Sequence, residues 1–359
     1  MLWGLLKWLK RAVIGLVLLV VLLLLPVGYI ETFCRADPDQ NAYQSIIADS
    51  EYQRAEANSY LTYPEWHIVY AYEGLAKVLK TGDEHGLDYF ASISSFWQSF
   101  CALNIVAGKH GGADFNTRAT IHTIGVSYTL EMAAKALYEE TIGRIAAFLR
   151  GDKKTFQDIY ASKMADEYAQ FLQQLPWYKY DFDRAVMELW QQPVINSLRG
   201  WERRLALGGE WKAKAAYARV IAEAVAAAGE AKVTIRSVVR GIPPSVLGEI
   251  EGITIVSSDG DQFTIETPRY RKFTRIVEAI LARNGQIIEV AGNDDVMLSA
   301  TGNPGMNKTA LTNGNVISRI TRDGYGGERV LVDTKILNLQ ALLGELQQNG
   351  YHLEHIYDY

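Results

Sequence analysis

An uncharged apolar run near the N-terminus constrains this chain more than any other feature. Residues 12–30 read AVIGLVLLVVLLLLPVGYI, and a helix needs about 20 such residues to cross the hydrocarbon core of a bilayer. Lys7, Lys10 and Arg11 precede the run, whereas the first charged residue after it is Glu31. Under the positive-inside rule, this asymmetry predicts a single-pass helix in the inner (plasma) membrane, with a cytoplasmic N-terminus and the bulk of the chain outside.

A cleaved signal peptide is the alternative, because it also places a basic segment before an apolar run. The run is long for the apolar region of a signal peptide, and no small-x-small cleavage site follows it. The sequence ETFC that ends at Cys34 is not a lipoprotein signal, because Phe33 stands where a small residue is needed. We therefore expect an uncleaved signal anchor over residues 1–35 and a periplasmic or otherwise extracytoplasmic body.

Composition excludes several classes of function. The net charge is −5 and the only basic cluster lies beside the apolar run, so we expect no nucleic-acid partner. Two cysteines, Cys34 and Cys101, are too few for a Cys/His zinc site or a disulfide scaffold, and we expect no cofactor. In an oxidising compartment Cys34 could pair with Cys101 or with Cys34 of a second copy, or both could stay unpaired.

The sequence SYLTYPEWHIVYAYEGL, which begins at Ser59, has the signature of a helix start. Thr62 and Glu65 fit a capping box, and Pro64 falls in the first turn, where its missing N–H is tolerated. The N-terminal staple would be formed by Leu61 and Trp66. An apolar stripe then follows at helical spacing, with a glycine placed to end the helix: Ile68, Tyr72, Leu75, Leu79 and Gly82.

Four ionisable residues are the candidates for chemistry. His67 is the one residue of the opening helix that local structure does not explain. A site gathered across packed helices from Glu65, His67, His122 and Glu131 would be catalytic, with His67 and His122 as the candidate metal ligands. No G-x-S-x-G or H-E-x-x-H sequence occurs, so the common hydrolase signatures are absent.

One string resembles a phosphate-binding loop. Residues 302–309 read GNPGMNKT, in which Gly302, Lys308 and Thr309 match G-x-x-x-x-G-K-[ST] while Asn307 replaces the second glycine. A strand ending in Asp333 even resembles the one that holds magnesium in such proteins. No long helix is predicted after Thr309, however, and phosphate binding depends on that helix N-terminus. A surface loop is therefore the preferred interpretation.

The chain is long enough for two domains plus an anchor, and its first domain, residues 36–229, has a helical pattern. Helices are expected over 89–107 and 120–149. A hairpin of these two segments dipping into the membrane is an alternative, but His122, Glu131 and Lys135 would be costly in lipid, so buried core helices are favoured. Further helices are expected over the ranges 154–175, 182–191 and 194–228.

The pattern changes to strands near residue 230. The sequence ITIVSSDGDQFTIET contains an Asp-Gly pair between two strand-like runs, which predicts a hairpin. Helices are expected over 268–283 and 338–349, and the order of elements over 262–357 approximates a ferredoxin-like split βαβ with an extra strand. The fold class expected is a transmembrane helix, an all-α domain and a small α+β domain over residues 230–359.

Three classes of function remain open on these grounds. The uncleaved anchor and the lack of a catalytic signature favour an interaction or assembly factor of an envelope complex, with a protein partner or a homo-oligomer. An envelope enzyme with a His/Glu site between helices is the second class. The third is an accessory protein of transport that binds a lipid or small ligand between its helices.

Overall fold

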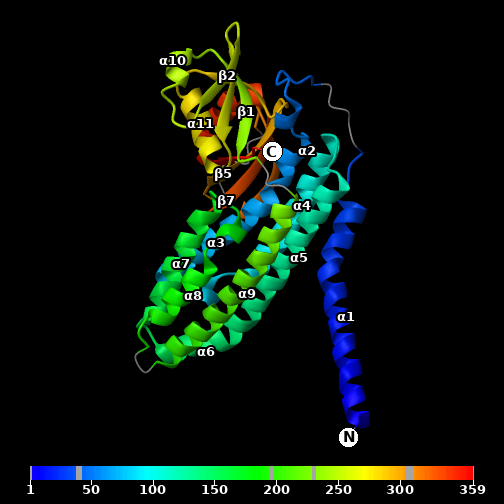
Figure 1. The fold of residues 1–359 in the computed structure, drawn as a ribbon, viewed down its shortest axis with the longest axis vertical. Coiled ribbons are helices and arrows are strands. Elements are labelled where there is room, and N and C mark those ends of the chain that lie inside the picture. The colour runs from blue at the N-terminus through cyan, green and yellow to red at the C-terminus, as the bar shows by residue number, and fades with distance from the viewer. Residues whose placement is uncertain (1, 38–42, 195–196, 229–231, 304–310, 359) are drawn as a thin grey trace.

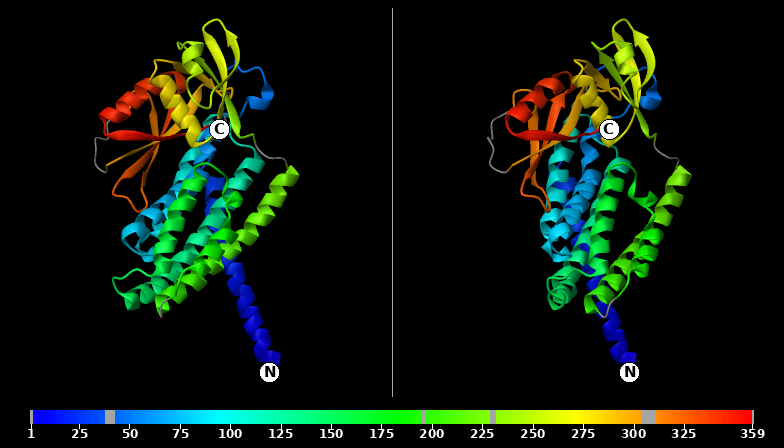
Figure 2. Two further views of the ribbon diagram at one scale, coloured as in Figure 1. Left: turned by 60° about the vertical axis from the view of Figure 1, so that its left-hand side comes forward. Right: turned by 90° about the vertical axis from the view of Figure 1, so that its left-hand side faces the viewer.

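A bundle of helices carries two small sheets at one end and a separate long helix along one side (Figure 1). The computed structural model describes residues 2–37, 43–194, 197–228, 232–303 and 311–358. Figure 2 shows from two further directions that the sheets lie at one end of the bundle, and that the N-terminus points away from them. The chain is thus mostly helical with an α+β C-terminal region, as expected.

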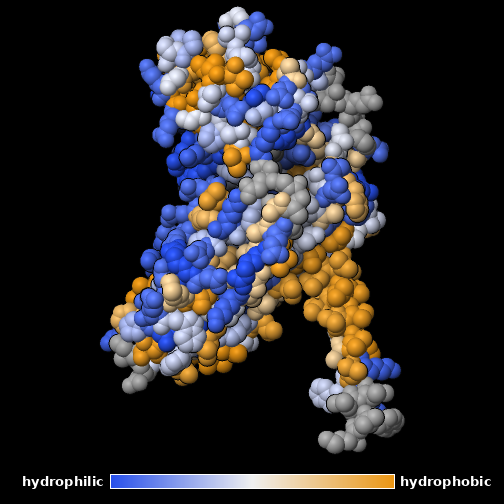
Figure 3. Space-filling model, in the orientation of Figure 1, coloured by the Kyte–Doolittle hydropathy of each residue, from blue (hydrophilic) through white to orange (hydrophobic). Residues whose placement is uncertain are grey.

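Helix α1 (Leu2–Phe33) contains the predicted apolar run and stands largely free of the body (Figure 3). Among the described residues, two helical stretches are long and apolar enough to cross a membrane: Lys7–Phe33 and Tyr89–Lys109. They differ in burial, because the most apolar part of the first is 6% buried and that of the second is 44% buried. The single exposed candidate is therefore α1.

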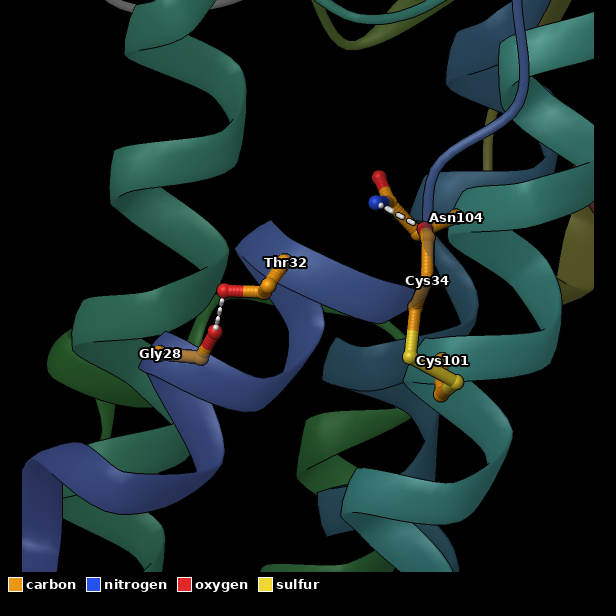
Figure 4. Close-up of a disulfide and its surroundings, with 5 residues drawn as sticks. All are labelled: Gly28, Thr32, Cys34, Cys101 and Asn104. Carbon is orange, nitrogen blue, oxygen red and sulfur yellow. Dashed lines mark hydrogen bonds between the residues drawn. A yellow bond between two sulfur atoms is a disulfide. The ribbon is translucent and has the colours of Figure 1, made fainter.

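The end of α1 is fastened to the body by covalent and polar contacts (Figure 4). Cys34 forms a disulfide with Cys101 of α4 (Tyr89–Lys109), and the backbone carbonyl of Cys34 accepts a 2.7 Å hydrogen bond from Asn104 Nδ2. The carboxylate of Glu31 lies 2.9 Å from His122 Nε2. Cys34 therefore pairs within the chain, and the last turn of α1 belongs to the folded body.

After α1 the chain crosses to the sheet region before it enters the bundle. The carboxylate of Glu289 accepts hydrogen bonds from the Tyr43 hydroxyl at 2.7 Å and from the backbone N–H of Ile46 and Ile47 at 2.6 and 3.0 Å. Short helix α2 (Ala57–Leu61) then leads into α3 (Tyr63–Thr81).

The predicted capping box at the start of α3 is not formed. Thr62 has helical dihedral angles, and its hydroxyl donates to the carbonyl of Ser59 instead of receiving a backbone N–H. The reason is that α2 precedes α3 without a break, so the N–H groups of α3 already have helical acceptors. Pro64 lies in the first turn and Gly82 ends the helix, as expected, although Gly82 has an extended and not a left-handed backbone.

The remaining helices complete the bundle in chain order. Residues predicted as one helix over 120–149 form α5 (Phe115–Tyr138), a π-helical segment (Glu139–Gly143) and α6 (Arg144–Arg150). The other helices are α7 (Phe156–Leu172), α8 (Phe182–Gln191) and α9 (Leu198–Ala228). Buried aromatic and small side chains fill the space between them, which confirms core helices at these positions.

A network of buried charges joins α9 to the π-helical segment and α7. Arg199 and Arg203 of α9 have almost no exposed surface. Arg199 contacts Glu84 at 2.6 Å and Asp158 at 2.8 Å, and Arg203 contacts Glu139 at 2.9 Å. Because each guanidinium has carboxylate partners, the charges stabilise one arrangement of the helices.

The C-terminal region contains two antiparallel four-stranded sheets. The first, in the order β2-β3-β1-β4, is built from β1 (Thr234–Arg240), β2 (Thr254–Asp259), β3 (Gln262–Pro268) and β4 (Gln286–Val290), with α10 (Pro244–Leu247) and α11 (Arg271–Leu281). The second, in the order β6-β7-β5-β8, is built from β5 (Asp295–Gly302), β6 (Asn315–Thr321), β7 (Glu328–Lys335) and β8 (Tyr351–Ile356), with α12 (Leu339–Gln348). The predicted hairpin is confirmed as β2–β3.

The two sheets are copies of one βββαβ unit. Each has the same strand order, and each places its longer helix between its third and fourth strands. Irregularities also fall at matching places: after Ile255 in β2 and after Val316 in β6, and after Val238 in β1 and after Ser299 in β5. Matching both order and bulges indicates an internal duplication.

The expected ferredoxin-like arrangement is not confirmed. The segment between β5 and β7, expected to be a loop, contains β6 (Asn315–Thr321). The predicted order of elements started at residue 262 and therefore left out β1, with which the first unit begins. Every strand pair among the described residues is antiparallel within a four-stranded sheet.

Alternation along β5 explains how the second sheet joins the two parts of the molecule. Val296, Leu298 and Ala300 face the core shared with the first sheet, while Met297 packs into the core of the helical bundle. Because successive side chains of a strand point to opposite faces, a strand buried on both faces has a continuous apolar pattern. The second sheet thus packs against the bundle on one face and against the core shared with the first unit on the other.

Candidate functional site

Ionisable side chains from the bundle and from the second sheet meet at the contact between them. Glu56 precedes α2, His110 ends α4, and Asp295 begins β5. Among the described residues these three form the one His/Cys/Asp/Glu group able to hold a metal ion, with ligand atoms within 4.8 Å of one another. We call this group, with the neighbouring Tyr60, Asp333 and Lys335, the acidic junction.

Hydrogen bonds fix the geometry of the acidic junction. His110 Nδ1 lies 2.9 Å from Glu56 Oε1 and 3.9 Å from Asp295 Oδ2. On the other side of the ring, the Tyr60 hydroxyl lies 3.1 Å from His110 Nε2 and donates to Asp333 Oδ1 at 2.6 Å. The imidazole is therefore held between two carboxylates and one tyrosine.

The pKa values in the acidic junction reflect crowded acidic groups. Burial and the neighbouring Glu56 raise the pKa of Asp295 to about 7, against the opposing effect of Lys335. Burial alone would lower the pKa of His110, but the hydrogen bond to Glu56 and the charges of nearby carboxylates raise it. Carboxylates placed this close share protons or a cation, because two ionised groups repel each other at such distances.

The donor set of the acidic junction fits a divalent cation. Carboxylate oxygens and an imidazole nitrogen are ligands that manganese, zinc and magnesium accept in differing proportions. Glu56, Asp295 and Asp333 bring three acidic groups against the ammonium of Lys335, which lies 2.5 Å from Asp295 Oδ2, and against the imidazole of His110, whose pKa is raised. A bound cation would take the place of protons held by Asp295 and His110 and would tie the bundle to the second sheet.

A polar cleft of about 380 Å³ opens elsewhere between bundle and second sheet. Its lining includes Trp66, Thr301, Arg322 and His355, and the buried His355 Nε2 has no hydrogen-bond partner in the part of the chain that the structure describes. Thr301 lies near the end of β5, whereas Asp295 begins that strand. A strand rises about 3.3 Å per residue, so the cleft lies roughly 20 Å from the acidic junction and does not serve it as a substrate site.

Two of the four sequence candidates start helix α3 but face different surroundings. Glu65 is exposed. His67 is buried, and its Nε2 lies 3.0 Å from the carbonyl of Ser92. Burial lowers the pKa of His67 to about 3, so the ring is neutral at pH 7. Neither residue belongs to the metal-ligating group found among the described residues.

The other two candidates, on α5, also have separate partners. His122 contacts Glu31 of α1. Glu131 accepts a hydrogen bond from the Tyr72 hydroxyl and lies 2.8 Å from Lys214 Nζ. Burial would raise the pKa of Glu131, but the charges of Lys214 and Lys135 lower it to about 2. The four candidates therefore engage separate sets of contacts and do not meet around one point.

The sequence contains weak signals for single residues of the acidic junction, but their spacing does not show that these residues meet. His110 precedes two glycines, and Asp295 follows a second aspartate in a short loop. Asp333 does lie in the junction, but most of the phosphate-loop resemblance, including Lys308 and Thr309, falls on residues 304–310, which lie outside the described residues. The side chains of the junction come together only through packing of the second sheet on the bundle.

Comparison with known proteins finds no relative of this chain. The chain matches no protein-family model, no curated protein and no solved structure.

Proposed function

We propose that the protein is an uncleaved single-pass protein of the inner (plasma) membrane, with a cytoplasmic N-terminus and a periplasmic or otherwise extracytoplasmic body. The observation that carries this proposal is the burial of Ile30 and Cys34, whose exposed fractions are 1% and 0%. A cleaved signal peptide is removed from the mature protein, so it has no reason to contribute core residues. The Cys34–Cys101 disulfide also fits an oxidising compartment on the extracytoplasmic side of that membrane.

Its role is that of an interaction or assembly factor that docks partners of an envelope complex. The second unit has its sheet packed on the bundle, but the first unit projects from the body (Figure 2). Strand β2 is the edge of that first sheet, and all six of its residues are exposed, including Ile255 and Val256. An exposed edge strand can pair with an extended segment of another protein.

The duplication supplies a matched control for this proposal. Ile255→Lys places a charge on β2, and Val316→Lys places one at the matching position of β6 in the second unit. Affinity purification of the full-length variants from the native membrane in mild detergent, followed by mass spectrometry, measures the partner. We expect a stoichiometric protein partner that Ile255→Lys loses and Val316→Lys keeps. A preparation without any partner, or equal recovery with both variants, would count against docking through β2.

A cation-dependent envelope enzyme is the second candidate, and the acidic junction favours it. Metal analysis of the purified full-length protein, with an Asp295→Asn variant as control, distinguishes the two functions. Bound metal at one equivalent, lost in the variant, together with the absence of a stoichiometric protein partner would support an enzyme. If metal is bound but its loss in the variant does not change recovery of the partner, docking remains the function and the cation is a structural link.

A further inference from the structure

The side of the bundle that faces α1 has an uncharged surface. On α4, the exposed residues between Asp88 and Lys109 are Phe90, Ala91, Ser94 and Gln98. On α5, from residue 116 to 137, they are Asn116, Thr120, Thr123, Ser127, Leu130, Ala134 and Leu137. A water-exposed helix face normally carries charged residues, whereas the exposed residues of these two helices are uncharged polar or apolar.

The ionisable residues of this hairpin point into the body. His122 is buried against Glu31, Glu131 contacts Lys214, and Lys135 lies 2.9 Å from Glu210 of α9. From the sequence, buried core helices are favoured over a membrane hairpin because these residues would be costly in lipid. Because each has an internal partner, they do not oppose contact between lipid and the outward face of the hairpin.

Large apolar side chains continue this surface over the end of the bundle. The π-helical segment, α6 and the start of α7 expose Ile142, Ile145, Phe148, Leu149, Phe156 and Ile159. The first turns of α9 expose Leu198, Trp201 and Leu205. Figure 3 shows apolar residues gathered at this lower end of the bundle. On α6 these side chains recur at helical spacing beside the exposed Glu140–Arg144 pair, and a large exposed apolar face of this kind marks a site of contact with a protein or a membrane.

The attachment of α1 places this surface at the depth of the membrane. A groove of about 1010 Å³ separates α1 from α4, and its lining runs from Val21 to Phe33 on α1 and from Ser94 to Cys101 on α4. From the contact at His122, α5 continues for about 24 Å to its end at Tyr138. The bundle runs from that contact toward the same end of the molecule as the N-terminus of α1 (Figures 1 and 2). Half of a bilayer's hydrocarbon core is about 15 Å thick, so the stretch of about 24 Å of α5 below that contact is long enough to cross the outer leaflet.

We propose that this α1-facing side of the bundle lies in the outer leaflet of the bilayer that α1 crosses, with phospholipid acyl chains covering it and filling the groove. The proposal rests on the membrane anchor proposed above. Continuity with α1 favours lipid over a second protein, because lipid must already surround the α1 side of the groove.

Photolabelling of the full-length protein in phosphatidylcholine nanodiscs tests the proposal. A carbene-generating probe dissolved in the acyl chains is activated by light, and labelled peptides are identified by mass spectrometry. We expect peptides with Ile142–Phe156 to be labelled to within about threefold of α1 peptides, because both would contact acyl chains. Peptides with Ile255 and Val256, which are also exposed and apolar, are the internal control and should stay unlabelled.

Three outcomes would overturn the inference, and they separate it from the proposed anchor. Labelling of α1 alone would remove the bundle from the leaflet and leave the anchor in place. Labelling of neither would reject the anchor and the inference together. Equal labelling of the Ile255 peptide and the bundle peptides would show that the bundle contacts acyl chains no more than a water-exposed apolar strand does, which would reject its place in the leaflet.

A variant supplies the second measurement. Ile145→Glu changes an exposed residue of α6, so the fold should be retained, and its matched control is Val256→Glu on β2. We expect Ile145→Glu to lower labelling around α6 by about fivefold or more without changing α1, since a carboxylate is excluded from the acyl-chain region. Unchanged labelling around α6 would contradict contact with acyl chains.

Discussion

Removal of the disulfide tests how firmly α1 is joined to the body. Cys34 and Cys101 are 67 residues apart, and the Cys34→Ser/Cys101→Ser double variant opens the loop that they close. In the chain-entropy treatment of cross-links, a loop of this length contributes about 4 kcal/mol to stability. Both residues touch the core, but serine keeps their approximate volume, so most of the loss should come from the freed loop.

Urea titration of the full-length protein in detergent, followed by tryptophan fluorescence, measures this loss. We expect the double variant to have a free energy of unfolding about 4 kcal/mol lower than the wild type. Reductant should lower the stability of the wild type by the same amount and leave the variant unchanged. Equal stability of the variant and the oxidised wild type, or alkylation of both cysteines in the folded wild type, would refute the reasoning.

Three further predictions concern packing, buried charge and pH. Gly74→Ala should lower stability in thermal unfolding by about 1–3 kcal/mol, because its Cβ would lie 2.5 Å from a carbonyl oxygen of the β6–β7 turn. Gly344→Ala, in open space on α12, should instead stabilise by about 0.5–1 kcal/mol; equal effects would contradict this. In urea titrations, Arg203→Met should cost about 3–5 kcal/mol by leaving buried carboxylates without their cation. Arg219→Met, which removes an exposed pair, should cost less than about 1 kcal/mol, and similar losses would argue against the buried network. Because the folded-state pKa of Asp295 is raised, its ionisation should reduce stability as pH rises from about 4 to 7; Asp295→Asn should remove this loss, and parallel pH profiles of variant and wild type would contradict it.

Local patterns predicted the elements whose signals are local. The apolar run of α1, the helix over 182–191 and the Asp-Gly turn between β2 and β3 each depend on neighbouring residues only. The capping box failed although its residues fit, because α2 already occupies the place where a free helix start would need a cap. A local pattern therefore predicts a helix better than it predicts what precedes the helix.

The C-terminal topology could not be read from local patterns because one strand has no clear alternation. Most residues of β6 are exposed or half-buried, and it follows a glycine- and asparagine-rich stretch. The duplication offers a second route, since Ile265-Glu266-Thr267 in β3 matches Val332-Asp333-Thr334 in β7 in type and in pairing register. Once β3 and β7 are aligned, β2 indicates where β6 should lie.

The acidic junction could not be predicted from the sequence, because its residues are far apart along the chain and meet only in the folded structure. Its residues come from the start of α2 and the residue before it, the end of α4 and two strands of the second sheet. The four sequence candidates were chosen from one run of helices and proved to contact separate partners. A histidine beside a glycine pair or an aspartate at a strand end becomes informative only when the layers of the fold are known.

The covalent link at the end of α1 changes what proteolysis can do to this protein. A cut anywhere in the described linker between Tyr43 and Glu56 divides the chain into two pieces, yet both remain joined through Cys34 and Cys101. The body would therefore stay attached to α1 after such a cut and would separate from it only when a reductant also opens the disulfide. Separation from α1 thus requires two independent chemical events, one hydrolytic and one reductive.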